Sequence, residues 1–324
     1  MIVIHSQQDE STTDDVLDWL YYFGMEQVKR VNGTNPINAK ALRINNHTQH
    51  SNLFDDAESS AINAYWYRRG HLACEISEPI KLGYSGFVTY FEKEYDHLTK
   101  GISQVFKQYR NINSFEDTGT NKLTNLAVAA GVDLLIPDTL VTADVKAIKA
   151  FSAIYPRIIT KAIGHNRITA TIDDNSYINI AVDTAIFDQD KINALPEENN
   201  FLPAVFQEYL EKKYELRIFY FHGQVYSMAI FSQLNEATKV DFRKHDTETP
   251  NRCVPYQLPE DIEKKLGRFM QHIAMNSGSI DMVVTPSGEH VFLEVNPVGQ
   301  LQWLSANCNY PIEREIAKFL LHDS

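Results

Sequence analysis

The sequence has little of what several common protein classes require. Only three of its 324 residues are cysteine, and Cys74, Cys253 and Cys308 are odd in number and widely spaced. We therefore expect free thiols, with neither a disulfide framework nor a zinc motif. No apolar run reaches the ~18 residues of a membrane-spanning helix, and the first residues lack the basic and apolar regions of a signal peptide. These absences predict a cytoplasmic protein.

Basic residues are scarce relative to acidic ones: 30 Lys and Arg against 42 Asp and Glu give a formal net charge of −12. A nucleic-acid partner would call for a basic surface, so none is expected. The glycine-poor N-terminal region contains no G-x-G-x-x-G, so no dinucleotide site is expected there. The chain also has no convincing Ser-His-Asp or Cys-His arrangement for covalent catalysis.

What remains is the composition of a folded chain, 44% hydrophobic and 11% aromatic, long enough for one large or two to three small domains. Strand-like and helix-like segments predict a mixed α/β fold. A polar segment without periodicity at 235–252 is expected to be a mobile loop over the site. The predicted elements used below are a strand at 2–4, helices at 95–109, 121–131 and 259–277, a strand at 157–163, and a hairpin that turns at 173–176.

Residues 279–300 are the most informative stretch. A turn signal at 286–288 separates two runs rich in β-branched and large apolar residues, which predicts a β-hairpin. If the hairpin is centred between the last two residues of that turn, Asp281 lies directly opposite Glu294. Because side chains alternate along a strand, Asn296 shares the face of Glu294. The other face is predicted to carry Ile280, Met282, Val284, Val291, Leu293 and Val295.

This arrangement predicts a divalent metal site. Two carboxylates about 4 Å apart repel by roughly 4 kcal/mol at an effective dielectric near 20, and a cation relieves that repulsion. Oxygen ligands without His or Cys select Mg²⁺ or Mn²⁺, with the remaining positions filled by water and phosphates, so the implied ligand is a metal-bound nucleotide. The alternative is a hairpin with solvated acids on its outer face. Asn296-Pro297 followed by Gly299 favours the site, because the strand end must present polar groups while turning sharply.

Two lysines could hold the phosphates of such a nucleotide. Lys161 ends an apolar run within the strand predicted at 157–163, and a buried ammonium without an anion is costly. A strand lysine and a metal site are the two halves of a triphosphate clamp. The alternative is an edge strand with a solvated lysine. Lys122, at the start of the helix predicted at 121–131, is a weaker signal.

The segment 207–211, Gln-Glu-Tyr-Leu-Glu, interrupts an apolar strand with polar groups. A strand end followed by a short connector exposes the backbone groups that adenine recognition requires, and a nearby carboxylate can accept a ribose hydroxyl. The alternative is an ordinary connector.

Taken in order, these segments resemble an ATP-grasp ligase over roughly residues 115–305. The residues that carry the resemblance are Asn121-Lys122, Ile159-Thr160-Lys161-Ala162, Gln207-Glu208-Tyr209-Leu210, Glu215-Leu216-Arg217, Asp281 and Glu294-Val295-Asn296-Pro297. Further motifs resemble the graspetide branch, the microviridin-type peptide macrocyclases, and especially the grasp-with-spasm peptide maturases. These motifs are Trp66-Tyr67-Arg68-Arg69, Val240-Asp241-Phe242-Arg243 and Gly299-Gln300 before Trp303.

The resemblance implies a role for each matching residue. Phosphate binding falls to Lys122 and Lys161, adenine binding to Glu208, Tyr209 and Leu210, and the ribose contact to Glu215, with Glu211 as the alternative. Metal binding falls to Asp281, Glu294 and Asn296. Arg217 and Arg243, together with Lys161, are implied as catalytic residues, with the two arginines facing the acceptor carboxylate or the acyl phosphate.

The resemblance also implies an α/β (α+β) ATP-grasp fold. It comprises an N-terminal pre-ATP-grasp domain at 1–115, a central subdomain at 116–204 with a leader-binding hairpin, and a C-terminal subdomain at 205–324 with the Mg²⁺ site. The implied activity is ATP-dependent and Mg²⁺-dependent macrocyclisation of a ribosomally made precursor peptide through ω-esters, by an enzyme that is a homodimer. Amide closure onto Lys, or a ligase that adds amino acids to a peptide carboxylate, are the rivals. A catalytically silent scaffold is disfavoured, because all three metal-ligand positions are intact.

Overall fold

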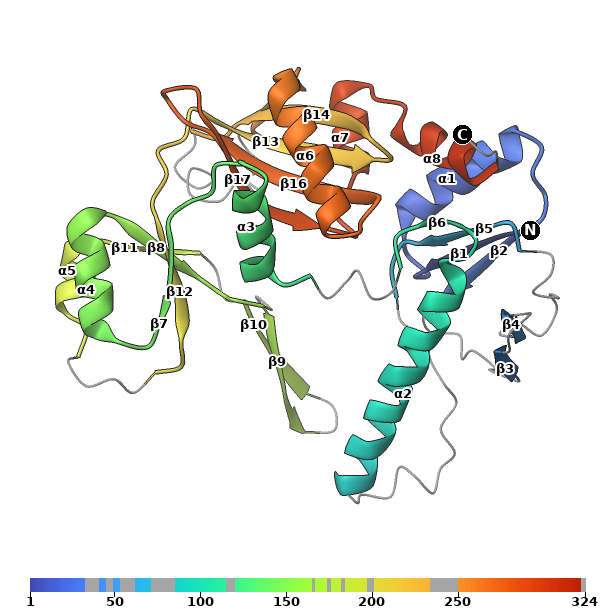
Figure 1. The fold of residues 1–324 in the computed structure, drawn as a ribbon, viewed down its shortest axis with the longest axis horizontal. Coiled ribbons are helices and arrows are strands. Elements are labelled where there is room, and N and C mark those ends of the chain that lie inside the picture. Colours follow the sequence, from blue (N-terminus) through green and yellow to red (C-terminus); the bar gives the residue numbers. More distant parts are fainter. Residues whose placement is uncertain are drawn as a thin grey trace.

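The computed structural model describes residues 1–32, 41–44, 49–52, 62–70, 85–114, 120–164, 167–173, 176–181, 184–196, 201–233 and 250–321. Within these ranges, strands and helices alternate in a mixed α/β architecture (Figure 1). The predicted α/β class is therefore confirmed. No helix of the described part is both long and apolar enough to cross a membrane.

The N-terminal part is a parallel sheet of order β2-β1-β5-β6. Its central strand β1 is completely buried and extends the predicted strand by two residues. Alternate residues of β1 pack against α1 on one face and α2 on the other. Helix α2 starts ten residues earlier than predicted. The elements are β1 (Ile2–Ser6), α1 (Ser11–Tyr22), β2 (Val28–Asn32), β5 (Ala64–Tyr67), α2 (Ser85–Phe106) and β6 (Arg110–Ile112), with a separate pair β3 (Ala41–Ile44) and β4 (Gln49–Asn52).

The central part contains the four-stranded sheet β11-β8-β12-β7 and a separate hairpin of β9 (Arg167–Asp173) and β10 (Ser176–Ala181). The hairpin predicted to turn at 173–176 is confirmed, and it extends away from the sheet (Figure 1). Helix α3 (Lys122–Gly131) begins as predicted, because Asn121 accepts hydrogen bonds from the backbone amides of residues 123 and 124. The other elements are β7 (Thr139–Thr142), α4 (Val145–Ile154), β8 (Ile158–Lys161), β11 (Ala185–Phe187), α5 (Gln189–Asn193) and β12 (Ala204–Glu208).

The C-terminal part is an antiparallel sheet of order β15-β14-β13-β16-β17. One face packs on α3 and α6, and the other shares a core with α7, α8 and the N-terminal sheet. The helix predicted at 259–277 ends early, because Ala274 takes a left-handed φ of 54° and β16 begins at Ser277. The elements are β13 (Tyr214–Phe221), β14 (Gln224–Phe231), β15 (Arg252–Pro255), α6 (Glu260–His272), β16 (Ser277–Val284), β17 (His290–Asn296), α7 (Gln302–Cys308) and α8 (Ile312–Leu321).

The β16–β17 hairpin pairs Asp281 with Glu294, as predicted. The face predicted for β16 is confirmed, because Ile280, Met282 and Val284 lie in one core. The face predicted for β17 is wrong beyond the pair, because a bulge shifts the register so that Met282 pairs with Phe292. Phe292, rather than Leu293, therefore joins the core against α6. A bulge adds one unpaired residue to a strand and reverses the side-chain alternation past it.

Candidate functional site

The two carboxylates of the β16–β17 hairpin lie side by side on one face of the C-terminal sheet. Asp281 pairs with Glu294, and two residues further along the strands Ser279 pairs with Asn296. Because alternate residues share a face, all four side chains project from the same side of the sheet. The predicted metal ligands are thus brought together by strand pairing alone.

Each carboxylate has a basic partner from another element. Arg217, which lies opposite Asp281 in β13, places Nη1 2.7 Å from Asp281 Oδ1. Lys122, the first residue of α3, places Nζ 3.2 Å from Glu294 Oε2. The Arg217–Asp281 pair is buried on both sides, whereas the Lys122–Glu294 pair is partly exposed. These cations offset the repulsion that two adjacent acids would otherwise create.

The Arg217 guanidinium therefore binds groups of the protein itself and does not only face a substrate. Its guanidinium binds Asp281 and also donates from Nη2 to the Gln300 carbonyl at 3.4 Å. Its role toward an acceptor carboxylate stays a proposal. Arg243, and most of the loop predicted at 235–252, lie outside the described residues.

Glu215 lies two residues before Arg217 on the same face of β13. Its carboxylate is buried, accepts a hydrogen bond from Ser232 Oγ at 2.8 Å and forms an ion pair with Lys212 at 3.2 Å. Burial raises the pKa of Glu215, and the charge of Asp281 raises it further, while Lys212 opposes the shift. This sheet face therefore carries the acids Glu215 and Asp281, each paired with a basic side chain.

The connector between β12 and β13 joins the central sheet to the C-terminal sheet. Glu208 accepts from the amide of Asp138 through Oε1 at 2.9 Å, and Glu211 pairs with Arg157 at 3.0 Å. The Arg157 guanidinium also lies 3.8 Å from the centre of the Tyr209 ring. Leu210 is half-buried. The connector is thus ordered by its own contacts at the junction of the two sheets, where the resemblance expects an adenine.

Lys161 is the last residue of β8 and pairs with Val205 of β12. It is half-buried. It belongs to the central sheet, whereas the carboxylates belong to the C-terminal sheet. The prediction that Lys161 and the carboxylates hold one triphosphate requires these two sheets to enclose a common ligand, and it stays a prediction.

The oxygen donors of this site fit Mg²⁺. No group of three or more His, Cys, Asp or Glu side chains suited to a metal occurs in the described part of the chain. Mg²⁺ needs only one or two carboxylates, since water and phosphates complete its octahedron. Asn296 Oδ1 accepts from the Val298 amide at 3.2 Å, which orients the amide oxygen. The two acids and this oxygen could therefore hold a metal-bound nucleotide.

The sequence interpretation missed the residues that hold the loop after Asn296. The carbonyls of this loop accept hydrogen bonds from Arg68 and Asn113, which belong to the N-terminal part. The motif Trp66-Tyr67-Arg68-Arg69 marks the resemblance, but nothing in its local pattern indicates a contact some 230 residues away.

No protein-family model matches the sequence, and neither does any curated protein. Solved structures match nearly the whole chain. The macrocyclase MdnC from Microcystis aeruginosa MRC, bound with precursor peptide MdnA, is 25% identical with a TM-score of 0.77, and the match covers 100% of both chains. A RiPP-associated ATP-grasp ligase from Chryseobacterium gregarium, in complex with ADP and a leader and core peptide, is 24% identical with a TM-score of 0.79, covering 98% of this chain and 94% of that one.

A third structure agrees with these two in fold. The ATP-grasp ligase PsnB, complexed with minimal precursor, Mg and ADP, is 15% identical with a TM-score of 0.75, covering 99% of this chain and 96% of that one. The protein thus has the ATP-grasp fold, and the predicted resemblance to the microviridin-type ligases is confirmed. The chain is therefore similar to ATP-grasp ligases over its whole length.

Proposed function

We propose that the protein is an ATP-dependent macrocyclase of a ribosomally made precursor peptide, one that forms ω-esters between Asp or Glu side chains and Ser or Thr hydroxyls. The observation that carries the proposal is the Asp281–Glu294 pair, with Arg217 and Lys122 as its cations, in a chain that matches MdnC over its full length. ATP and Mg²⁺ are the proposed cofactors.

Specific residues would hold these groups. Asp281, Glu294 and Asn296 would bind Mg²⁺, which supplies positive charge to the phosphate oxygens during transfer. Lys122 and Lys161 would bind the phosphates, and the connector from Glu208 to Glu211 would contact the nucleoside. Glu215 would meet the ribose, with Glu211 as the alternative.

The reaction follows from the chemistry of a carboxylate, which is a poor electrophile at neutral pH. The γ-phosphoryl group of ATP is transferred to a side-chain carboxylate oxygen of the peptide, and ADP leaves. A hydroxyl of the same peptide then attacks the acyl carbon, loses its proton, and expels phosphate. Proximity contributes most to this second step, because both reactants belong to one chain. Each ring costs one ATP and removes one water from the peptide.

The β9–β10 hairpin is the proposed leader-binding element. Tyr177, Ile178 and Ile180 are 68%, 48% and 50% exposed. Successive residues of a strand point to opposite faces, so apolar side chains face solvent on both sides of β10. Exposed apolar surface of this kind is typical of an interaction site.

Tyr177→Ser is expected to raise KM for the precursor peptide about tenfold and to leave kcat unchanged, because one buried aromatic contact contributes about 1–3 kcal/mol to binding. Steady-state kinetics on the peptide measure both constants. Tyr22→Ser is the matched control, since Tyr22 is an exposed tyrosine at the end of α1. Equal kinetic constants for the two variants would show that the hairpin does not bind the leader.

The experiment that tests the function is incubation of the protein with the peptide and Mg–ATP, followed by mass spectrometry. Loss of one water per ring supports macrocyclisation, and cleavage of the new bond by mild alkali distinguishes an ester from an amide. Turnover with free amino acids and no leader requirement would instead identify the rival ligase that adds amino acids to a carboxylate. The homodimer and the cytoplasmic location stay predictions, and light scattering checks the first.

A further inference from the structure

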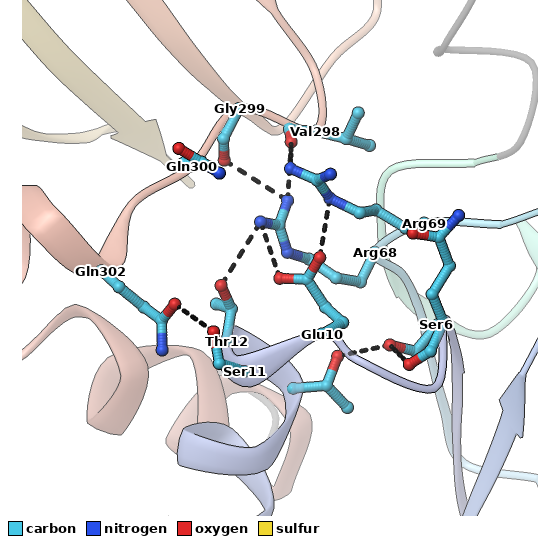
Figure 2. Close-up of polar contacts among 12 residues, drawn as sticks. Ser6, Glu10, Ser11, Thr12, Arg68, Arg69, Val298, Gly299, Gln300 and Gln302 are labelled. Atoms are coloured by element: carbon cyan, nitrogen blue, oxygen red, sulfur yellow. Dashed lines mark hydrogen bonds and ion pairs between the residues drawn. The ribbon is translucent and has the colours of Figure 1, made fainter. Parts of the chain in front are cut away.

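The loop that follows the candidate metal ligand Asn296 accepts hydrogen bonds from side chains at four successive carbonyl groups. Figure 2 shows those at Val298 and Gly299. Four of the five hydrogen bonds come from the N-terminal part of the chain, and one comes from β13. Because each of these four carbonyl groups accepts a hydrogen bond from a side chain, the backbone of the loop is fixed. The donors and their acceptors are Asn113 Nδ2 with Pro297 (3.0 Å), Arg68 Nη1 with Val298 (2.8 Å) and with Gly299 (3.3 Å), Arg69 Nη2 with Val298 (3.3 Å), and Arg217 Nη2 with Gln300 (3.4 Å).

Arg68 is the centre of this arrangement. It follows β5, is only 3% exposed, and its Nη2 lies 3.1 Å from Glu10 Oε1 and 3.3 Å from Thr12 Oγ1. Arg69 pairs with the other oxygen of Glu10 at 2.7 Å. Burial lowers the pKa of Arg68 to about 10, and Glu10 opposes the shift, so the guanidinium stays charged at neutral pH. Figure 2 shows Arg68 between Glu10 and the loop.

The loop in turn is pressed against Arg217. A Cβ at Gly299 would lie 2.4 Å from Ser279 Cβ and 2.8 Å from Arg217 Nη2. There is no space for the loop to move toward the sheet without displacing Arg217. Arg217 Nη1 is 2.7 Å from the Asp281 carboxylate. A continuous set of direct contacts therefore runs from Arg68 through the loop and Arg217 to a candidate metal ligand.

We propose that Arg68 is a positioning residue for metal-dependent nucleotide binding. It acts through the backbone of residues 298–299, which fixes Arg217 and thereby the orientation of Asp281. This inference rests on one part of the proposed function, the binding of Mg²⁺ at Asp281. The planar fork of Arg reaches the loop carbonyls with one nitrogen and the Glu10 and Thr12 oxygens with the other, which the single ammonium of Lys does not do.

The chain offers a matched control. Arg110, in β6, donates from Nη1 to the Leu320 carbonyl of α8 at 3.0 Å. This contact also joins the N-terminal sheet to a C-terminal carbonyl, but it lies on α8 rather than on the loop beside Arg217. If Arg68 only stabilised the fold, replacing either arginine would have the same effect on the Mg²⁺ dependence of nucleotide binding.

The test measures binding of the non-hydrolysable analogue AMPPNP by calorimetry, with and without Mg²⁺, for Arg68→Ala, Arg68→Lys and Arg110→Ala. In both Arg68 variants we expect at least a fivefold loss of the tightening that Mg²⁺ gives the wild type, with nucleotide affinity in EDTA unchanged. Arg110→Ala is expected to lower Tm and keep the full Mg²⁺ effect. If Arg68→Ala does not fold, Asn113→Ala releases the Pro297 carbonyl without leaving a buried charge, and it is expected to reduce the Mg²⁺ effect in the same direction.

An unchanged Mg²⁺ effect in folded Arg68 variants, or an equal loss in Arg110→Ala, would overturn the proposal. The result is separable from the proposed function, because the assay contains no peptide. If the wild type binds Mg–AMPPNP but closes no ring in the peptide, macrocyclisation is refuted. The binding measurements on the Arg68 variants then still test the role of Arg68.

Discussion

Asp281→Asn is expected to lower the rate of ATP-dependent peptide modification on the order of 10³-fold, because it removes a charge that acts on the transferring phosphate through the metal. The substitution keeps the side-chain size and one oxygen that can accept from Arg217. It also takes the anion from a buried ion pair. We therefore expect the free energy of unfolding to fall by about 1–3 kcal/mol. ADP release and urea unfolding measure the two effects.

The control for this prediction is Asp261→Asn. Asp261 is exposed on α6 and pairs with Lys265 at 3.7 Å, so its loss should change the free energy of unfolding by less than about 0.5 kcal/mol and leave the rate unchanged. If Asp281→Asn keeps more than a tenth of the wild-type rate, Asp281 is not a metal ligand.

Gly299→Ala is expected to have the second largest effect. The added methyl group would lie 2.4 Å from Ser279 Cβ and 2.5 Å from Ser279 Oγ, so the loop must move. Overpacking of this kind typically costs about 1–3 kcal/mol of stability. Because Arg217 Nη2 lies on the same side at 2.8 Å, the movement also displaces the partner of Asp281, and we expect kcat to fall about 10²-fold.

Gly267→Ala is the matched control for that prediction. Apart from its chain neighbours and the adjacent backbone of the helix, no atom lies within 4 Å of a Cβ at Gly267, which is inside α6. Alanine in a helix interior should raise stability by about 0.5–1 kcal/mol. Thermal unfolding and single-turnover kinetics distinguish the two variants. A Gly299→Ala protein with wild-type Tm and kcat would show that the loop is not constrained as described.

Local patterns were enough to predict the most important part of the candidate site. The turn at 286–288 and the period of two along a strand place Asp281 opposite Glu294, and the structure has that pair. The same reasoning failed past the pair on β17 only, since a bulge is invisible in a hydrophobic pattern and places Phe292 rather than Leu293 in the core. It also extended α6 too far, because an alanine in the left-handed region carries no sequence signal.

The cations around the acids depend on tertiary structure and could not be predicted in the same way. Arg217 reaches Asp281 through the register between β13 and β16, which are separated by more than 50 residues. Arg68 reaches the loop near residue 299 only because the N-terminal and C-terminal sheets share a core. Local propensity contains no information on such contacts, so the contacts of Arg68 with the loop and of Arg217 with Asp281 emerge only from the structure.

The most direct test of the central claim is the affinity of AMPPNP for the wild type, Asp281→Asn and Lys161→Met, each measured by calorimetry with and without Mg²⁺. We expect Mg²⁺ to tighten binding to the wild type at least about tenfold, or ~1.4 kcal/mol. Asp281→Asn should abolish this gain, and Lys161→Met should weaken binding under both conditions. Wild-type affinity that does not respond to Mg²⁺, or Lys161→Met binding as tightly as the wild type, would contradict a common site for the acidic strand pair and the strand lysine.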